Sequence, residues 1–119
     1  MQKKRIIVVD DDESIRKTFF LLLVTKYNVY IAGDGAEALA RFQKADIDLI
    51  IADFRLPGEN GLQMIKNFRQ AGYQGKVVLI SAFPDQIKPD EIQNLKIDHL
   101  FTKPLDLKAL TGTIDLLLA

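Results

Sequence analysis

The sequence alternates short apolar runs with longer segments in which apolar residues recur at helical spacing. The first run, "RIIVV" at 5–9, is apolar on both parities after its first residue, so neither face of a strand there suits contact with water. A strand of this kind is typical of a parallel sheet that helices cover on both sides. Four similar runs follow, and we predict strands at residues 5–9, 28–32, 48–52, 76–80 and 98–101.

The segments between these runs have the period of amphipathic helices. Leu62, Ile65 and Phe68, for example, lie at helical spacing after a loop rich in proline and glycine. Pro84 and Pro89 leave room only for a short helix that begins near Pro89. The predicted helices cover residues 14–25, 33–45, a segment from 62, the short segment from 89, and a segment from 107 to 117.

Five strand–helix units predict an α/β fold with a doubly wound, five-stranded parallel sheet. We expect the flavodoxin-like (βα)5 arrangement, which is a three-layer sandwich with strand order 2-1-3-4-5. The chain has 119 residues, a common size for one domain, so we interpret residues 1–119 as one domain.

The composition of the chain excludes several classes of protein. The formal net charge of +0 gives no basic surface for direct binding of nucleic acid or of an anionic membrane. The absence of cysteine excludes disulfides, thiolate zinc sites and cysteine nucleophiles. The longest apolar run, "FFLLLV" at 19–24, is far too short to span a bilayer. We therefore expect a cytoplasmic domain with no membrane or direct nucleic-acid partner.

Chemically active side chains follow four of the five predicted strands. Asp10 and Asp11 follow the first strand, Asp53 the third, Ser81 the fourth, and Lys103 the fifth. The carboxyl ends of neighbouring parallel strands meet at one edge of a sheet, and ligands bind there in doubly wound folds. We therefore expect three carboxylates, a hydroxyl and an ammonium group to converge at this edge.

Carboxylates that cluster in this way are costly unless a cation neutralises them. A set of oxygen ligands favours a hard ion that keeps some of its waters, so Mg²⁺ is the first expectation, with Mn²⁺ or Ca²⁺ able to replace it. Such an ion also attracts a phosphate group and neutralises charge during its transfer. Asp12 and Glu13 have a simpler interpretation, because acids suit the positive end of the helix that follows them.

Four motifs carry a resemblance to a known family. In order along the chain they are "VVDDDESIR", "LIIADFRLPGENG", "VLISA" and "FTKPLD". Together they resemble the receiver domain of two-component response regulators, in the manner of single-domain chemotaxis or sporulation-phosphorelay regulators. The resemblance runs from Lys4 to about Leu118 and is specific because all four motifs are in register.

The resemblance implies a role for each acid. Asp53 matches the phosphoacceptor, which takes a phosphoryl group from a phosphohistidine of a sensor histidine kinase or a histidine phosphotransfer protein. Asp11 and Asp53 match direct Mg²⁺ ligands, and Asp10 matches an acid that reaches the ion largely through water. The backbone carbonyl of Arg55 matches the remaining protein ligand.

It also implies roles for the other polar residues. Lys103 matches a lysine that pairs with the phosphoryl oxygens, and Ser81 matches a switch hydroxyl. The Lys103–Pro104 peptide matches one that is cis in the family. Such a domain promotes its own phosphorylation and dephosphorylation but is not an enzyme in the ordinary sense. Its further partners are a downstream output domain or protein and, on phosphorylation, a second copy of itself.

Three positions depart from the family pattern or tune it. Leu100 stands where the family has an aromatic switch residue, so aromatic switching is in doubt. His99 is interpreted as a surface residue at the strand edge and Phe101 as a core residue. Arg55 and Phe83 occupy positions that tune hydrolysis in the family, and we hypothesise that their bulk gives the phosphoaspartate a moderate to long life.

The apolar run at 19–24 leaves residues over after one face of the helix packs on the sheet. We expect these remaining residues, such as Phe20 or Leu21, to pack on the last helix, and the alternative is a docking patch for a helix of a histidine-containing partner.

Three other functions fit parts of the sequence. "GDGAEA" at 33–38 matches a dinucleotide-binding turn, although it follows the second strand rather than the first. Asp10 and Asp12 give the D-x-D pattern of an aspartyl-phosphate phosphatase of the haloacid dehalogenase type. The third alternative is a receiver-like binding module that works without phosphorylation.

Overall fold

Five parallel strands form the middle layer of the computed structural model, which describes residues 3–43 and 45–119. The strands are β1 (Arg5–Val9), β2 (Asn28–Ala32), β3 (Leu49–Asp53), β4 (Lys76–Ser81) and β5 (His99–Thr102). They lie in the order β2-β1-β3-β4-β5, and every neighbouring pair is parallel. The doubly wound sheet and the strand order are therefore as predicted.

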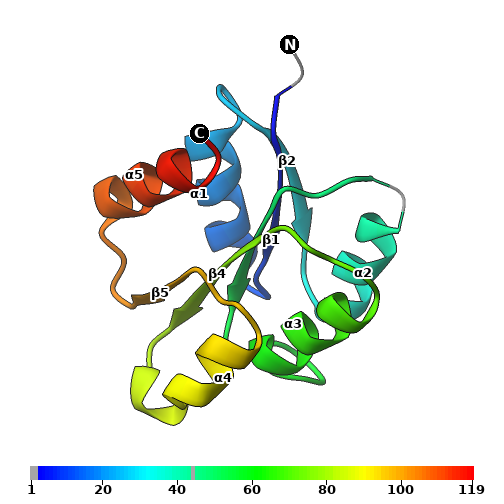
Figure 1. Cartoon of the computed structure of the whole chain (residues 1–119). Coiled ribbons are helices and arrows are strands. Elements are labelled where there is room, and N and C mark those ends of the chain that lie inside the picture. Colours follow the sequence, from blue (N-terminus) through cyan, green and yellow to red (C-terminus); the bar gives the residue numbers. More distant parts are fainter. Residues whose placement is uncertain (1–2, 44) are drawn as a thin grey trace.

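Helices cover both faces of this sheet, which completes the three layers (Figure 1). On one face lie α1 (Glu13–Leu23) and α5 (Leu107–Leu117). On the other lie α2 (Gly35–Phe42), α3 (Gly61–Gln70) and α4 (Pro89–Asn94), and a short 3-10 turn (Pro84–Gln86) precedes α4.

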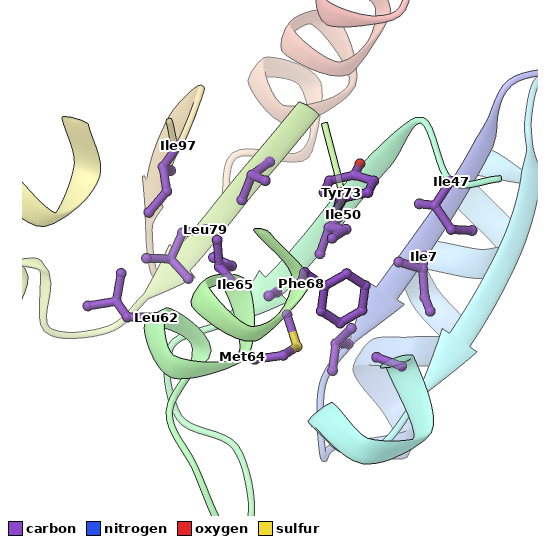
Figure 2. Close-up of a cluster of buried hydrophobic side chains, with 14 of the residues drawn as sticks. Ile7, Ile47, Ile50, Leu62, Met64, Ile65, Phe68, Tyr73, Leu79 and Ile97 are labelled. Atoms are coloured by element: carbon purple, nitrogen blue, oxygen red, sulfur yellow. The ribbon is translucent and has the colours of Figure 1, made fainter. Parts of the chain in front are cut away.

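The central strands give alternate side chains to two apolar clusters, because successive residues of a strand face opposite sides. Ile6 of β1 packs in the cluster that holds Phe19 of α1 and Leu110 of α5. Ile7 packs in the other cluster, where Figure 2 shows Phe68 of α3 near the strands. Both faces of the central strands β1, β3 and β4 are therefore buried, which explains why these three strands are unbroken apolar runs in the sequence.

Two strands begin one residue later than predicted, and the same physical reason explains both. Asp48 and Asp98 precede β3 and β5 instead of starting them. The Asp48 carboxylate accepts the Arg5 N–H at 2.8 Å, and the Asp98 carboxylate accepts the Val77 N–H at 2.8 Å. Each acid thus satisfies the first free donor of the neighbouring strand.

The capping residues of the first two helices are as predicted, whereas the bounds of these helices differ from the predicted ones. Asp12 accepts the N–H groups of Ser14 and Ile15, so its predicted role as a cap is confirmed, and α1 begins at Glu13. Asp34 caps α2, which runs from Gly35 to Phe42 rather than over 33–45; Lys44 in that predicted segment lies outside the described residues. The helix near Pro89 is short, as predicted.

One side of α1 is apolar and exposed. Leu21 is 72% exposed and Phe20 is 38% exposed, and with Lys17 and Ile31 they line a hollow of about 300 Å³ beside β2. The expected packing on the last helix is therefore wrong for Leu21. Among the helices of the described chain, not one combines the length and the apolar character that a bilayer span requires.

Candidate functional site

The carboxyl ends of β1 and β3 bring three acids together. Val9 pairs with Ala52 in the sheet, so the next residues along the two strands, Asp10 and Asp53, are neighbours. Asp10, Asp11 and Asp53 each offer a carboxylate oxygen, and these oxygens lie within 4.8 Å of one another. Asp10 is 3% exposed and Asp53 is 7% exposed, whereas Asp11 faces solvent.

The charged form of Asp10 is disfavoured in this cluster of acids, chiefly because the carboxyl is buried. Burial raises the pKa of this carboxyl to about 6, the N–H of Asp12 opposes the rise, and the negative charge of Asp53 adds to it. The Asp12 N–H lies 2.9 Å from Asp10 Oδ1. Three carboxylate oxygens around one point, two of them from buried residues, are a donor set that fits a hard divalent cation such as Mg²⁺.

Lys103 places a positive charge against this cluster. Its Nζ donates to Asp53 Oδ2 at 2.8 Å, and its own backbone N–H donates to the Ser81 carbonyl at 2.9 Å. Burial alone would lower the pKa of the lysine, but the hydrogen bond to Asp53 and the charges of the three acids outweigh it and raise the pKa. The Lys103–Pro104 peptide is cis, as the resemblance implies.

Ser81 lies at the same edge but is engaged elsewhere. It is 1% exposed, and its Oγ accepts the Phe83 N–H at 2.9 Å. The Arg55 N–H donates to Asp53 Oδ1 at 3.3 Å, and the Arg55 guanidinium lies 4.7 Å from the centre of the Phe83 ring. Arg55 and Phe83, each two residues after the end of its strand, β3 and β4, therefore stack on each other.

One residue of the site escaped the reasoning from sequence. A Cβ at Gly61 would collide with the carbonyl oxygen of Asp53, so only glycine fits there. The Gly61 N–H donates to the Phe54 carbonyl at 2.7 Å, which brings the start of α3 back against the end of β3. The available signal was a glycine at the first position of a helix, where the helical pattern alone has no need of one.

The residues of β5 stay out of the site. His99 is exposed and its ring lies 4.3 Å from that of Phe101, centre to centre, in agreement with a surface interpretation. Leu100 and Phe101 are partly buried and pack against the apolar clusters on opposite faces of the sheet. Phe101 therefore lies at the edge of the core.

The "GDGAEA" segment forms a capped turn into a helix. Asp34 Oδ1 accepts the Glu37 N–H at 2.8 Å, and a carboxylate oxygen of Glu37 accepts the Gly33 N–H at 3.3 Å. A turn with these bonds needs no bound nucleotide. The second acid of the D-x-D pattern, Asp12, is likewise engaged as the cap of α1.

Comparison with known proteins gives a consistent answer. The family model described as "Response regulator receiver domain" matches residues 6–115. The response regulator RR06 of Streptococcus pneumoniae is 32% identical over 92 residues, which is 77% of this chain and 42% of RR06. The chain spans less than half the length of the curated relatives that it matches.

Solved structures agree over nearly the whole chain. The chemotaxis response regulator CheY4 of Vibrio cholerae is 30% identical with a TM-score of 0.86, covering 98% of this chain and 100% of CheY4. The response regulator TrrA of Thermotoga maritima, solved in complex with Mg²⁺–BeF, is 29% identical with a TM-score of 0.84, covering 97% of this chain and 99% of TrrA.

Proposed function

The chain belongs to the response regulator receiver domain family of two-component systems, and we propose that it takes a phosphoryl group onto Asp53 with the help of Mg²⁺. The donor is a phosphohistidine of a sensor histidine kinase or a histidine phosphotransfer protein. The observation that most directly supports Asp53 as the phosphoacceptor is that it lies in the acid cluster of Asp10, Asp11 and Asp53 and also pairs with Lys103.

Asp10, Asp11 and Asp53 would hold the Mg²⁺ ion, together with the backbone carbonyl of Arg55 and water. The likeness to TrrA, which was solved with Mg²⁺–BeF, supports this assignment. A bound Mg²⁺ supplies positive charge that lets a carboxylate approach a negatively charged phosphoryl group.

The chemistry assigned to the protein is nucleophilic. A carboxylate oxygen of Asp53 bonds to phosphorus as the bond from phosphorus to the donor imidazole nitrogen breaks, and the imidazole leaves with the electron pair. The Lys103 ammonium, now on Asp53 Oδ2, is placed to pair with a phosphoryl oxygen. Ser81 uses its oxygen to accept from Phe83, so its hydroxyl hydrogen can turn to the phosphoryl group.

The test is incubation with acetyl phosphate and Mg²⁺, followed by the mass of the intact chain. We expect one phosphoryl group on the wild type and none on Asp53→Asn, because an amide is a poor nucleophile. An equal gain in both proteins would remove Asp53 as acceptor. If Asp10→Asn gained no phosphoryl group and Asp53→Asn still gained one, the chemistry would be that of the phosphatase type instead.

The same sample tests the lifetime of the phosphoaspartate once the donor is removed. We infer a moderate to long life from the stack of Arg55 on Phe83, because bulk at these two positions would restrict the approach of water to Asp53. Loss of the phosphoryl group within seconds would contradict this shielding. A binding module that works without phosphorylation would show neither the mass gain nor a response of the Asp10 and Asp11 amide shifts to Mg²⁺.

The partners follow from the same proposal. The family works with histidine kinases and output domains, and we assign this chain a cytoplasmic setting, one receiver domain over residues 1–119, and a downstream output domain or protein. The exposed hollow at Phe20 and Leu21 is the candidate face for a helix of the phosphodonor. The face of α4, β5 and α5 is the candidate for output or for a phosphorylation-dependent homodimer.

A further inference from the structure

The loop at 55–60 joins β3 to α3 and is held closed at its base. Arg55 and Asn60 form an antiparallel bridge, and the Gly61 N–H donates to the Phe54 carbonyl at 2.7 Å. At the tip, Gly58 has a φ of +80° directly after a proline, which is the pattern of a type II turn. This turn presents the next residue, Glu59, to α2.

Glu59 makes two contacts that fix the tip of the loop. Its Oε2 accepts the Asn67 side-chain amide of α3 at 3.2 Å. Its Oε1 lies against Gly35, the first residue of α2, in the space that a Cβ would take. A negative charge is stabilised there, because the first turn of a helix carries partial positive charge.

The contact also explains the second glycine of the "GDG" turn, for which the proposed function gives no reason. Gly35 is buried, and a Cβ there would displace the Glu59 carboxylate, which is the end of a flexible side chain. A hollow of about 400 Å³, lined by residues of α2, α3 and the loop, adjoins the contact. The Glu59 side chain therefore has space to move into when it is displaced, without disruption of the core.

We propose that Glu59, lodged against Gly35 and Asn67, is a positioning residue that holds the 55–60 loop so that the backbone of Arg55 stays at the acid cluster. This rests on the proposed function, in which the Arg55 carbonyl contributes to the metal site. The Arg55 N–H already reaches Asp53 Oδ1, so movement of the loop acts directly on the phosphoacceptor.

Three variants test the contact. Glu59→Ala removes the carboxylate, Gly35→Ala forces it out, and Glu59→Gln keeps its shape. We expect Glu59→Ala and Gly35→Ala each to weaken Mg²⁺ binding about tenfold, as is typical for residues that support metal ligands. The double variant should bind no more weakly than either single one, since both remove the same contact. Glu59→Gln should bind within about threefold of the wild type, because it keeps the bond to Asn67.

Gly112→Ala is the matched control for the glycine, because a Cβ at Gly112 meets open space. Mg²⁺ affinity is read from amide shifts, and the closure of the loop is read without metal from hydrogen exchange of the Gly61 amide. Exchange should speed up in Glu59→Ala and Gly35→Ala and not in Gly112→Ala. At saturating Mg²⁺ the rate of phosphorylation by acetyl phosphate should return to that of the wild type.

Unchanged Gly61 exchange and unchanged Mg²⁺ affinity in Glu59→Ala would overturn the proposal, and this variant decides alone if Gly35→Ala does not fold. Additive losses in the double variant would also overturn it, because they would mean two separate effects. If the wild type takes no phosphoryl group while exchange and affinity change as expected, the loop contact stands and the proposed function fails.

Discussion

Asp10 shows at the scale of one residue what the site costs the protein. Its carboxyl is buried beside Asp53, and its pKa rises from 3.8 to about 6. The folded state therefore holds a proton that the unfolded state releases between about pH 4 and 6, and stability falls as the pH rises through this range. At pH 7 and without a cation, the ionised Asp10 destabilises the fold.

This predicts that Asp10→Asn stabilises the metal-free protein at pH 7 by on the order of 3 kcal/mol, since the pKa rises by about two units and one unit corresponds to about 1.4 kcal/mol. The gain should vanish near pH 4, where the wild-type carboxyl is neutral. Asparagine keeps an oxygen that can accept the Asp12 N–H. Urea unfolding with a chelator at the two pH values measures the difference, and Asp11→Asn, at a solvent-facing position, is the control with a smaller gain. Equal gains at both pH values would contradict the argument.

The convergence of the polar residues at one edge of the sheet could be predicted from the sequence, and the contacts that support them could not. Asp10, Asp53 and Ser81 follow apolar strands, and the order of strands in a doubly wound sheet is restricted enough to bring them to one edge. The contact between Glu59 and Gly35 joins a loop of one strand–helix unit to the start of the helix of another. It leaves no periodic signal in the sequence, because it depends on where one side chain ends in space.

At the scale of elements, α4 is the least secured helix of the described chain. It has six residues and none of them is fully buried. Its C-terminal end is held by Arg69 of α3, whose guanidinium donates to the carbonyls of Leu95 at 3.0 Å and Lys96 at 3.0 Å. The same guanidinium donates to the backbone carbonyls of Tyr73 at 3.1 Å and Gly75 at 2.9 Å. One side chain thus joins the ends of α3 and α4 to the start of β4.

We predict that Arg69→Ala frees α4, with hydrogen exchange in residues 89–95 faster by about tenfold or more. Global stability should fall by about 2 kcal/mol, within the range for hydrogen bonds from a charged group. Arg69→Lys should restore little, because a single ammonium cannot span four carbonyls. Arg41→Ala, an exposed arginine at the end of α2, is the control and should change stability by less than about 0.5 kcal/mol. Unchanged exchange in α4 would show that its partly buried residues hold it unaided.

The predicted element bounds failed where side chains replaced backbone partners. Asp48 and Asp98 directly precede the strand residues of β3 and β5 in the sequence. Each uses its carboxylate to accept a backbone N–H of a neighbouring strand. The short turn at Pro84–Gln86 went unpredicted because two prolines indicate interruption without its geometry. The type and order of the elements were correct, since the apolar periods alone determine them.

At the scale of the whole molecule, the proposed metal site exists only in the folded chain, because β1 and β3 supply its acids from distant parts of the sequence. An ion that binds only the folded state stabilises it by mass action. We predict that Mg²⁺ at a hundred times its Kd raises the free energy of unfolding by about 2.7 kcal/mol. Urea titrations with and without Mg²⁺ measure this, and Asp11→Asn should lose most of the increase. The same increase in that variant would place the ion elsewhere.

The bonds that Asp48 and Asp98 make lie at the end of the sheet opposite to the acid cluster, and they restrict movement of the strands at that end. Their side-chain and main-chain hydrogen bonds link the amino ends of β1, β3, β4 and β5, which are four adjacent strands of the sheet. We therefore expect a rearrangement around Asp53 to involve the loops at the other end and to leave the amino ends of these strands paired. In the proposed function, the sheet would then serve as a fixed frame, and a signal would leave the domain through the positions of the loops and helices attached to it.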